Sequence, residues 1–215
     1  MSRFTILLGG DFLPTERTAG QIAGSRVIAA DSGIRHAMQI GIEPELWVGD
    51  FDSVSQELLD EWRRVPREVF PSGKDQTDGE LAVAAAVARG ATALTLAGAF
   101  GGARADHAHL HLAMAVRLAE QGLSVLLTSG WQEGAPILPQ QATAYDLADG
   151  TLFSILGFSD LEGLTVTGAR WPLSRITMPF GSTLTISNEV KGRLSIELGS
   201  GRALLVAHPY PAEGF

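Results

Sequence analysis

The chain of 215 residues contains no cysteine, so disulfide bonds, thiolate nucleophiles and cysteine-ligated zinc sites are excluded. Lysine and arginine are also scarce, 16 against 24 aspartates and glutamates, and the formal net charge is −8. The basic residues form no run, which argues against nucleic acid or an anionic membrane as a partner. An acidic chain can still bind a polyphosphate if a metal ion neutralises the charge locally.

Long hydrophobic runs are absent as well. No apolar stretch reaches the roughly 20 residues of a membrane-spanning helix, and the start of the chain lacks the cleavage-site pattern of a signal peptide. We therefore expect a cytoplasmic protein. Aromatic residues make up only 7% of the chain, yet 45% is hydrophobic, which suffices for the core of one large domain or two small ones.

In the first part of the chain, short apolar runs alternate with helical patterns. The predicted strands are residues 4–8, 27–30, 45–48, 69–70, 93–97 and 125–128. This alternation is typical of βαβ units and predicts an α/β fold, with a Rossmann-like, mostly parallel sheet flanked by helices. Polar loops then follow Ala30, Val48, Phe70 and Ala97 at the carboxyl ends of strands, where open α/β sheets bind ligands.

The pattern changes near Trp131, beyond which no long helix is predicted. Short alternating runs follow at residues 135–138, 142–147, 152–156, 164–166, 183–186, 194–198 and 203–206. Their spacing predicts a smaller antiparallel all-β sandwich domain. We place the boundary between about Gly130 and Gly134, which gives domains 1–131 and 132–215.

Asp50 and Asp52 are the first candidate functional residues, because both follow the buried run 45–48 in a turn that begins with Gly49. Two carboxylates held close together repel, so they favour a shared proton or a shared cation. Magnesium prefers hard oxygen ligands and binds through one or two carboxylates plus substrate phosphates. The pair therefore suggests a magnesium–phosphate site, although a solvated turn has the same composition.

Other acidic residues lie in equivalent loops. Asp31 follows the run 27–30, and Asp75 and Asp78 lie in the loop after residues 69–70. Thr77 and Glu80 have the spacing of a capping box, which predicts that a helix begins there. Each aspartate alone can be a turn or cap residue. Together they could converge on one cation.

Lys74 and Arg104 are the candidate counter-charges for a phosphate, the first as a point charge and the second as a planar fork. Gly101 and Gly102 allow close backbone approach to a ligand and precede a helix whose amino terminus favours anions. A solvated loop lysine and a flexible turn are the alternatives. The chain has neither a Walker motif nor a dinucleotide fingerprint.

In the second part of the chain, Trp171 lies beside a predicted loop, and Ser187 and Asn188 form a polar turn. A tryptophan can stack on a flat or cationic ring, and serine and asparagine can hydrogen-bond a heterocycle. A packed tryptophan and an ordinary hairpin turn explain the same residues.

Taken together, these residues resemble the thiamin pyrophosphokinase (thiamin diphosphokinase) family. The matching segments, in the order of the family, are residues 30–33, 41–45, 49–53, 74–78, 101–107, 168–173 and 187–189. They extend over nearly the whole chain. The resemblance implies an α/β catalytic domain that binds ATP and magnesium, followed by a β domain that binds thiamin and forms a homodimer with sites between subunits. It implies pyrophosphoryl transfer from ATP to the thiamin hydroxyl, giving thiamin diphosphate and AMP.

The resemblance also implies a role for each matching residue. Asp50, Asp52 and Asp78 become magnesium ligands, and with Arg104 and Asp106 they form the catalytic set. Contacts to nucleotide or phosphate come from Asp31, Ser32, Gly33, Lys74, Asp75, Gly102, Arg104 and His107. Contacts to thiamin come from Trp171, Ser187 and Asn188. Asp106 or Asp75 is the candidate base for the attacking hydroxyl.

The chain departs from the family pattern in two places. Asp31-Ser32-Gly33 replaces the usual Asp-Gly-Gly, with Ile34-Arg35 where Ala-Asn often follows, and one extra residue precedes Arg104.

Two other functions remain open. One is a 6-hydroxymethyl-dihydropterin pyrophosphokinase of similar core, and the other is a non-catalytic sensor of a nucleotide or thiamin diphosphate. The intact set of carboxylates argues against the sensor.

Overall fold

The computed structural model describes residues 2–52, 54–73 and 75–210. The chain divides into two compact units. Unit 1 comprises the chain up to His111 together with Gly122–Gly130, and unit 2 comprises Leu112–Gln121 together with the chain from Trp131 onward. Among the described residues, no helix is both long enough and apolar enough to span a membrane.

Unit 1 contains a parallel sheet, as predicted. Its strands are β1 (Arg3–Leu7), β2 (Arg26–Ala30), β3 (Leu46–Gly49), β4 (Arg67–Val69), β5 (Ala93–Ala97) and β6 (Ser124–Thr128). Their order is β6-β5-β1-β2-β3-β4, and all the pairings are parallel. The chain therefore moves outward from β1 to β4 and returns to the other side of β1 with β5. This reversal between β1 and β5 is a topological switch point, and in open α/β sheets ligands bind at its carboxyl side.

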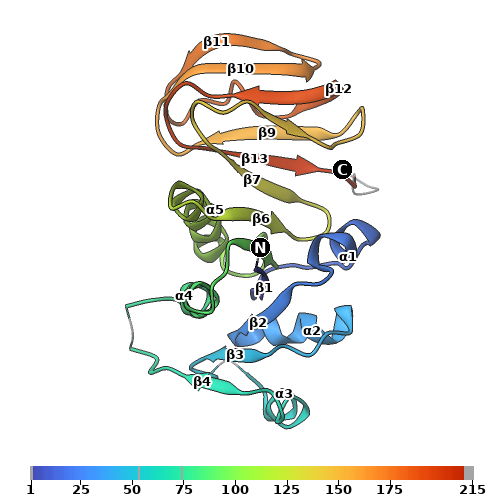
Figure 1. Ribbon diagram of the computed structural model, residues 1–215, viewed down its shortest axis with the longest axis vertical. Coiled ribbons are helices and arrows are strands. Elements are labelled where there is room, and N and C mark those ends of the chain that lie inside the picture. The colour runs from blue at the N-terminus through green and yellow to red at the C-terminus, as the bar shows by residue number, and fades with distance from the viewer. Residues whose placement is uncertain (1, 53, 74, 211–215) are drawn as a thin grey trace. The chain divides into compact units, whose positions relative to one another are not determined.

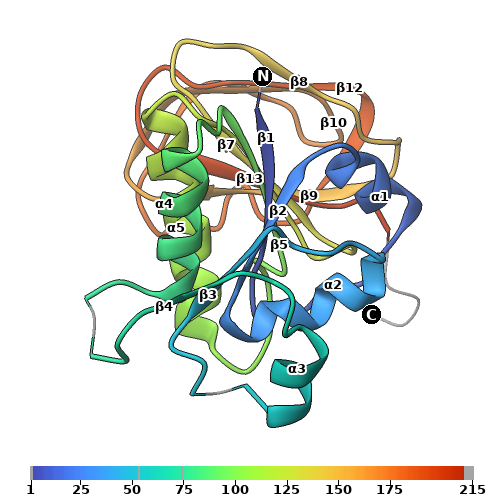
Figure 2. The same ribbon diagram turned by 60° about the horizontal axis from the view of Figure 1, so that its bottom comes forward.

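The helices of this part of the chain connect the strands. They are α1 (Glu16–Ile22), a 3₁₀ turn η1 (Asp31–Ile34), α2 (Arg35–Ile40), α3 (Gln56–Glu61), α4 (Asp78–Ala88) and α5 (Ala105–Glu120). Helix α4 covers one face of the sheet, and α1 and α2 cover the other (Figure 2). The predicted capping box is confirmed, since Thr77 and Glu80 bond each other's backbone at the start of α4. Gly41 ends α2 with φ 66°, in the left-handed region that glycine tolerates.

Buried aliphatic side chains fill the core of unit 1, with Trp47 as its largest member at 0% exposure. The indole Nε1 of Trp47 donates a hydrogen bond of 2.8 Å to the main-chain oxygen of Asp31. The ring of Phe51 packs edge-on against the indole at 4.9 Å. One core residue of β3 therefore orients the loops that follow both β2 and β3.

Unit 2 is antiparallel, as predicted, and no helix occurs in its described residues after Trp131. Its strands are β7 (Glu133–Ile137), β8 (Thr143–Tyr145), β9 (Leu152–Gly157), β10 (Leu161–Ala169), β11 (Leu173–Met178), β12 (Asn188–Glu197) and β13 (Ala203–His208), and Figure 1 shows most of them in yellow to red. The start of β12 pairs with β9, and most of its remainder pairs with β10 and β8. Strands β9, β10 and β12 contribute side chains to one buried core, which includes Phe153, Leu164 and Leu194.

Two predicted strands differ from the structure. Residues 183–186 were expected to form a strand but lie in the turn between β11 and β12, and the strand predicted at residues 69–70 is misplaced. Residues 69–70 were expected to be extended, whereas β4 covers Arg67–Val69. All three of its residues are exposed, so the hydrophobic pattern did not mark it. The prediction depended on the apolar pair Val69-Phe70, which lies at the end of the strand.

Candidate active site

Three carboxylates meet at the carboxyl edge of the parallel sheet. Asp31, Asp50 and Asp78 each offer an oxygen, and these oxygens lie within 4.8 Å of one another. All three side chains are partly buried. In the described part of the chain, this is the only group of three or more acidic, histidine or cysteine side chains that is close enough to hold a metal ion.

Local structure positions each of these residues. Asp31 begins η1 directly after β2, with φ 43°. Asp50 directly follows β3, and Asp78 is the first residue of α4 after the Thr77 cap. Gly49 provides room, because a Cβ there would lie 3.3 Å from the Cα, Cβ and Oδ1 of Asp31. The carboxylates therefore come from three segments that are distant in sequence and adjacent in the sheet.

Asp52 lies beside this group rather than in it. Phe51, at φ 62°, turns the chain between Asp50 and Asp52, and the Asp52 amide donates to Asp50 Oδ1 at 3.2 Å. A side-chain hydrogen bond with Asp50 and the negative charges of Asp50, Asp31 and Asp78 raise the pKa of Asp52. The resemblance implied Asp50, Asp52 and Asp78 as metal ligands, with Asp31 close by. The structure brings Asp31, Asp50 and Asp78 together, and the metal-binding role of Asp52 stays a prediction.

The donor set consists entirely of carboxylate oxygens, which suits a hard cation such as magnesium. Three carboxylates at this separation repel one another, and a divalent ion would remove the repulsion. Asp75 is exposed and is not part of the group. Lys74, the predicted phosphate-binding lysine, lies outside the described residues.

The loop that follows β5 is bonded to the segment that follows β1. Asp11 Oδ2 accepts a hydrogen bond of 3.0 Å from the Gly102 amide. A Cβ on Gly101 would lie 2.1 Å from the same oxygen, and Gly101 and Gly102 have φ values of 63° and 82°. Glycine is therefore required here for close packing and for the left-handed backbone.

Sequence analysis missed Asp11. The signal was available, because Gly9-Gly10-Asp11 follows the first predicted strand and so forms another loop at a strand's carboxyl end.

Ser32 and Gly33 also face the segment after β1. A Cβ on Gly9 would meet Ser32 Oγ at 2.8 Å, and a Cβ on Gly33 would meet the main-chain oxygen of Leu7 at 2.2 Å. Gly33 is buried. Its evident role is to let η1 pack directly against the backbone of β1, and its predicted nucleotide contact stays a prediction.

Arg104 and Asp106 form an exposed ion pair at the start of α5. Arg104 Nε and Nη2 donate to the two carboxylate oxygens of Asp106 at 3.0 and 2.6 Å. The hydrogen bond from Arg104 lowers the pKa of Asp106 well below its usual range. Both oxygens of Asp106 are therefore engaged by Arg104, and the role of Asp106 as a base stays a prediction.

His107 packs edge-on against His111, with ring centroids 6.5 Å apart. His111 is buried and its Nδ1 lies 3.2 Å from the main-chain oxygen of Ala99. Burial lowers the pKa of His111. His111 is therefore a packed, neutral side chain beneath the loop after β5.

In unit 2, Asn188 fixes the turn that carries Trp171. Asn188 Nδ2 donates to the Trp171 oxygen at 2.9 Å, and Asn188 Oδ1 accepts from the Trp171 amide at 3.2 Å. Asn188 is buried, whereas Trp171 is 54% exposed, with the Arg170 guanidinium 4.8 Å from its ring centroid. Ser187, at φ 58°, donates its amide to Ser154 Oγ at 3.0 Å. In this arrangement Trp171 is available to a ligand, and Asn188 holds it in place.

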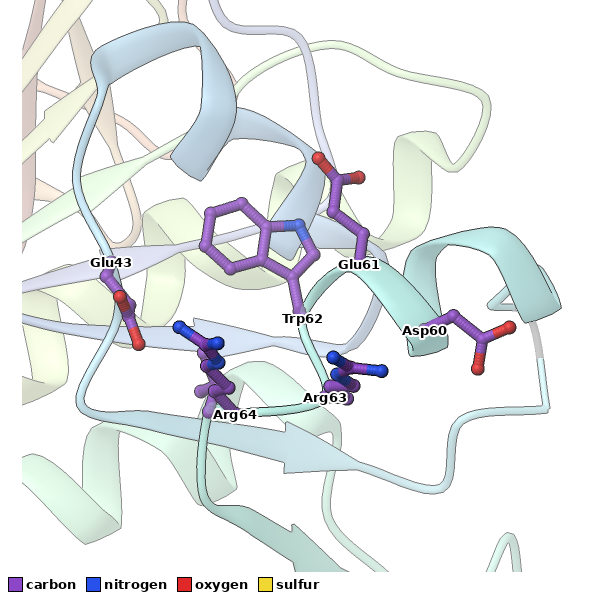
Figure 3. A pocket seen from close by; sticks show the side chains of 7 residues that line it. Glu43, Asp60, Glu61, Trp62, Arg63 and Arg64 are labelled. Carbon is purple, nitrogen blue, oxygen red and sulfur yellow. The ribbon is translucent and has the colours of Figure 1, made fainter.

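A hollow in unit 1 lies away from these residues. It has a volume of about 340 Å³ and is lined by Glu43, Asp60, Glu61, Trp62, Arg63, Arg64 and Val65 (Figure 3). These residues precede β3 and β4, at the amino-terminal ends of the strands. None of the predicted site residues lines this hollow.

Comparison with known proteins identifies the chain. The sequence model for "Thiamin pyrophosphokinase, catalytic domain" matches residues 23–127, and that for "Thiamin pyrophosphokinase, vitamin B1 binding domain" matches residues 140–202. A curated thiamine pyrophosphokinase of Bacillus subtilis is 30% identical over 169 residues, which cover 76% of this chain and 77% of the relative. The chain belongs to the thiamin pyrophosphokinase family.

Solved structures of this family have the same fold. The Bacillus subtilis thiamine pyrophosphokinase superposes with a TM-score of 0.84 at 24% identity, covering 96% of this chain and 99% of that one. The Geobacillus thermodenitrificans thiamin pyrophosphokinase has a TM-score of 0.78 at 25% identity, with 99% of both chains covered. The yeast thiamin pyrophosphokinase has a TM-score of 0.71 at 12% identity, covering 96% of this chain and 86% of that one. The family predicted from the motifs is confirmed, and so is the fold class.

Proposed function

We propose that this chain transfers the pyrophosphoryl group of ATP to the hydroxyl of thiamin, with magnesium, giving thiamin diphosphate and AMP. The observation that supports it most directly is the carboxylate group of Asp31, Asp50 and Asp78 at the ligand-binding edge of the sheet, in a chain of this family. The match of residues 140–202 to a vitamin B1 binding domain favours thiamin over a hydroxymethylpterin as the acceptor.

The two units would have different roles, with metal and phosphate binding in unit 1 and thiamin binding in unit 2. Asp31, Asp50 and Asp78 in unit 1 would hold magnesium, which offsets the charge of the phosphates when bound. The loop around Gly102, which Asp11 holds in place, would let the backbone approach the phosphates closely. In unit 2, the exposed ring of Trp171 offers a stacking surface for the flat rings of thiamin. Phosphoryl transfer depends mainly on positioning and charge neutralisation, which is what these groups supply.

The decisive assay incubates the purified chain with ATP and magnesium, with either thiamin or 6-hydroxymethyl-dihydropterin, and resolves the products by mass. We expect AMP and thiamin diphosphate in equal amounts with thiamin, and none when magnesium is removed by a chelator. AMP that forms only with the pterin would transfer the proposal to the alternative acceptor. No AMP with either acceptor would indicate a sensor without turnover.

We also propose that two copies of the chain associate as a homodimer. Unit 2 exposes several large apolar side chains close together in sequence, with Phe180 68%, Leu184 61% and Ile186 45% exposed. Such a concentration of exposed apolar surface is typical of an interaction site. We expect a solution mass of twice the 22.7 kDa of one chain. A mass of 22.7 kDa at assay concentration would contradict the dimer.

A further inference from the structure

Arg35 is a cation at the switch point of the sheet that no motif assigned. It is the first residue of α2 and directly follows η1. Its Nη2 donates to the main-chain oxygens of Gly9 and Gly10 at 2.5 and 3.1 Å. Both glycines lie just beyond Leu8 after the end of β1, which neighbours β5 at the switch point. The guanidinium is therefore held at the carboxyl edge where a ligand is expected.

The remaining donors of Arg35 are uncommitted. Within residues 2–52, 54–73 and 75–210, its Nε and Nη1 make no hydrogen bond and no carboxylate forms an ion pair with it. The side chain is exposed. An arginine fixed through Nη2, with Nε and Nη1 uncommitted, keeps its full positive charge and can donate single charge-assisted hydrogen bonds to phosphate oxygens.

Arg104, the arginine that the sequence favoured, is paired with a carboxylate, unlike Arg35. Its Nε and Nη2 both bind Asp106, and that pair is about two-thirds exposed, at 65% and 64% of the two side chains. A phosphate would have to displace the Asp106 carboxylate or use the one nitrogen that remains. Arg35 has no such competitor among the described side chains, so it is the better placed of the two arginines to neutralise a phosphate.

We propose that Arg35 binds the polyphosphate chain of ATP from the side of β1, opposite in charge to the Asp31–Asp50–Asp78 group. The inference rests on the proposed function, because it assumes that a nucleotide triphosphate is the donor. A phosphate contact would also explain why this chain has arginine at a position where the family often has asparagine. The positive side chain would partly compensate for the dense negative charge of this edge.

Loss of Arg35 should not collapse the turn to which it is bonded, because other contacts hold that turn. The Gly10 amide donates to the Gly98 oxygen at 3.0 Å, and the Asp11 amide donates to the Phe100 oxygen at 2.8 Å. His36 Nε2 lies 3.0 Å from the Gly10 oxygen. Burial lowers the pKa of His36, so a neutral imidazole donates this bond. An effect of Arg35 on phosphate binding can therefore be separated from an effect on the backbone.

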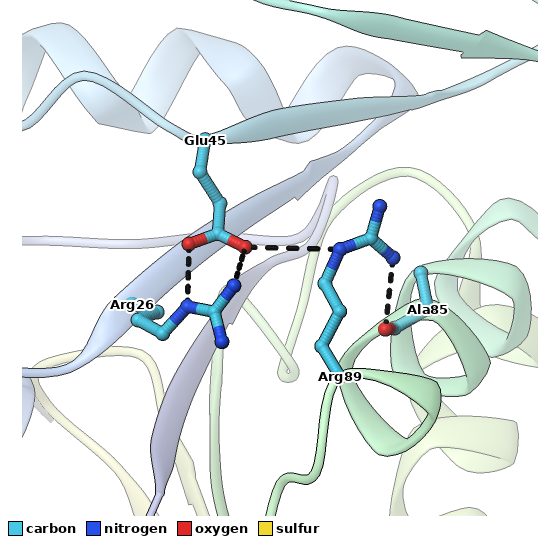
Figure 4. A network of polar contacts seen from close by, with 4 residues as sticks. All are labelled: Arg26, Glu45, Ala85 and Arg89. Carbon is cyan, nitrogen blue, oxygen red and sulfur yellow. Dashed lines mark hydrogen bonds and ion pairs between the residues drawn. The ribbon is translucent and has the colours of Figure 1, made fainter.

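A matched control exists at the opposite end of the strands. Figure 4 shows Glu45 accepting two hydrogen bonds of 2.7 Å from Arg26, with Arg89 Nε 3.9 Å from the same carboxylate. Arg26 begins β2, and Arg89 follows the last residue of α4. Arg89→Gln removes one positive charge, as Arg35→Gln does, but at the amino-terminal edge of the sheet.

The test measures binding of ATP, inorganic tripolyphosphate and adenosine by calorimetry, in the presence of magnesium, for the wild-type chain, Arg35→Gln, Arg35→Lys and Arg89→Gln. We expect Arg35→Gln to weaken binding of ATP and of tripolyphosphate by about tenfold to a hundredfold, the usual range for one charge-assisted contact. Adenosine should bind as to the wild type. Arg35→Lys should restore part of the loss, and Arg89→Gln should change nothing.

Two results would overturn the inference. Unchanged tripolyphosphate binding by Arg35→Gln would show that Arg35 does not contact phosphate, and an equal loss of adenosine binding would show that it acts through the backbone. Failure of the proposed function is distinguishable, because it appears in the wild type as missing thiamin diphosphate. If the wild type makes no product but Arg35→Gln still loses tripolyphosphate, only the inference about Arg35 stands. A wild type that binds neither ATP nor tripolyphosphate overturns both.

Discussion

Asp50→Asn is expected to leave the chain folded and to lower its turnover at least about a hundredfold, which corresponds to roughly 3 kcal/mol of transition-state stabilisation. Asp50 is a member of the three-carboxylate group and also accepts the Asp52 amide. Asparagine keeps the size of the side chain and an acceptor for that amide, but it removes one of the negative charges that hold a divalent ion. The measurement is the rate of AMP formation as magnesium is titrated, compared between variant and wild type.

Asp60→Asn is the matched control. Asp60 is an exposed residue of α3 whose Oδ1 accepts a hydrogen bond of 3.1 Å from Gln56, and asparagine can retain that bond. The same chemical change away from the carboxylate group should leave turnover and the magnesium requirement unaltered. Wild-type activity in Asp50→Asn, at the same magnesium concentration, would show that the metal is held elsewhere.

The second large effect concerns stability. Gly33→Ala should destabilise the fold by about 3 kcal/mol, the upper end of the usual range for overpacking, because the new Cβ would lie 2.2 Å from the Leu7 oxygen and 2.6 Å from its carbon. Both atoms belong to the backbone of β1, so no side-chain rotation can relieve the clash. For a chain of this length, we expect thermal unfolding to occur on the order of 10 °C lower.

Gly20→Ala is the corresponding control in α1. Nothing lies within 4 Å of the Cβ that would be added there, and alanine is the better helix former. The substitution should stabilise the chain by roughly 0.5–1 kcal/mol. If Gly33→Ala unfolded at the wild-type temperature, η1 would not pack as closely on β1 as the structure indicates.

Much of the site was predictable because parallel strands align their carboxyl ends. Once residues 27–30 and 45–48 were recognised as strands, Asp31 and Asp50 had to emerge at the same edge of one sheet. The capping box at Thr77 placed Asp78 at the first turn of its helix. Hydrophobic periodicity and cap chemistry are local signals, and here they were sufficient to bring three distant carboxylates together.

What the sequence did not reveal depends on side-chain direction and on contacts between loops. The turn after Gly49 was predicted to direct Asp50 and Asp52 at one cation, but only Asp50 joins the group of three carboxylates, and Phe51 at φ 62° turns the chain between the two. Asp11 and Arg35 form their bonds with glycine backbone far away in sequence. No periodic pattern encodes such contacts, because they depend on how the loops meet after the sheet has formed.

The short strand β4 has a consequence for how the chain behaves in concentrated solution. It terminates the parallel sheet, so its outer side could serve as a template for a foreign strand. Only three residues long, it follows Pro66 and includes Arg67 and Glu68, and the guanidinium of Arg67 lies over the ring of Trp47 at 5.1 Å. A short, charged edge strand that follows a proline disfavours edge-to-edge pairing with other chains. We therefore expect this side of the molecule to resist fibril growth.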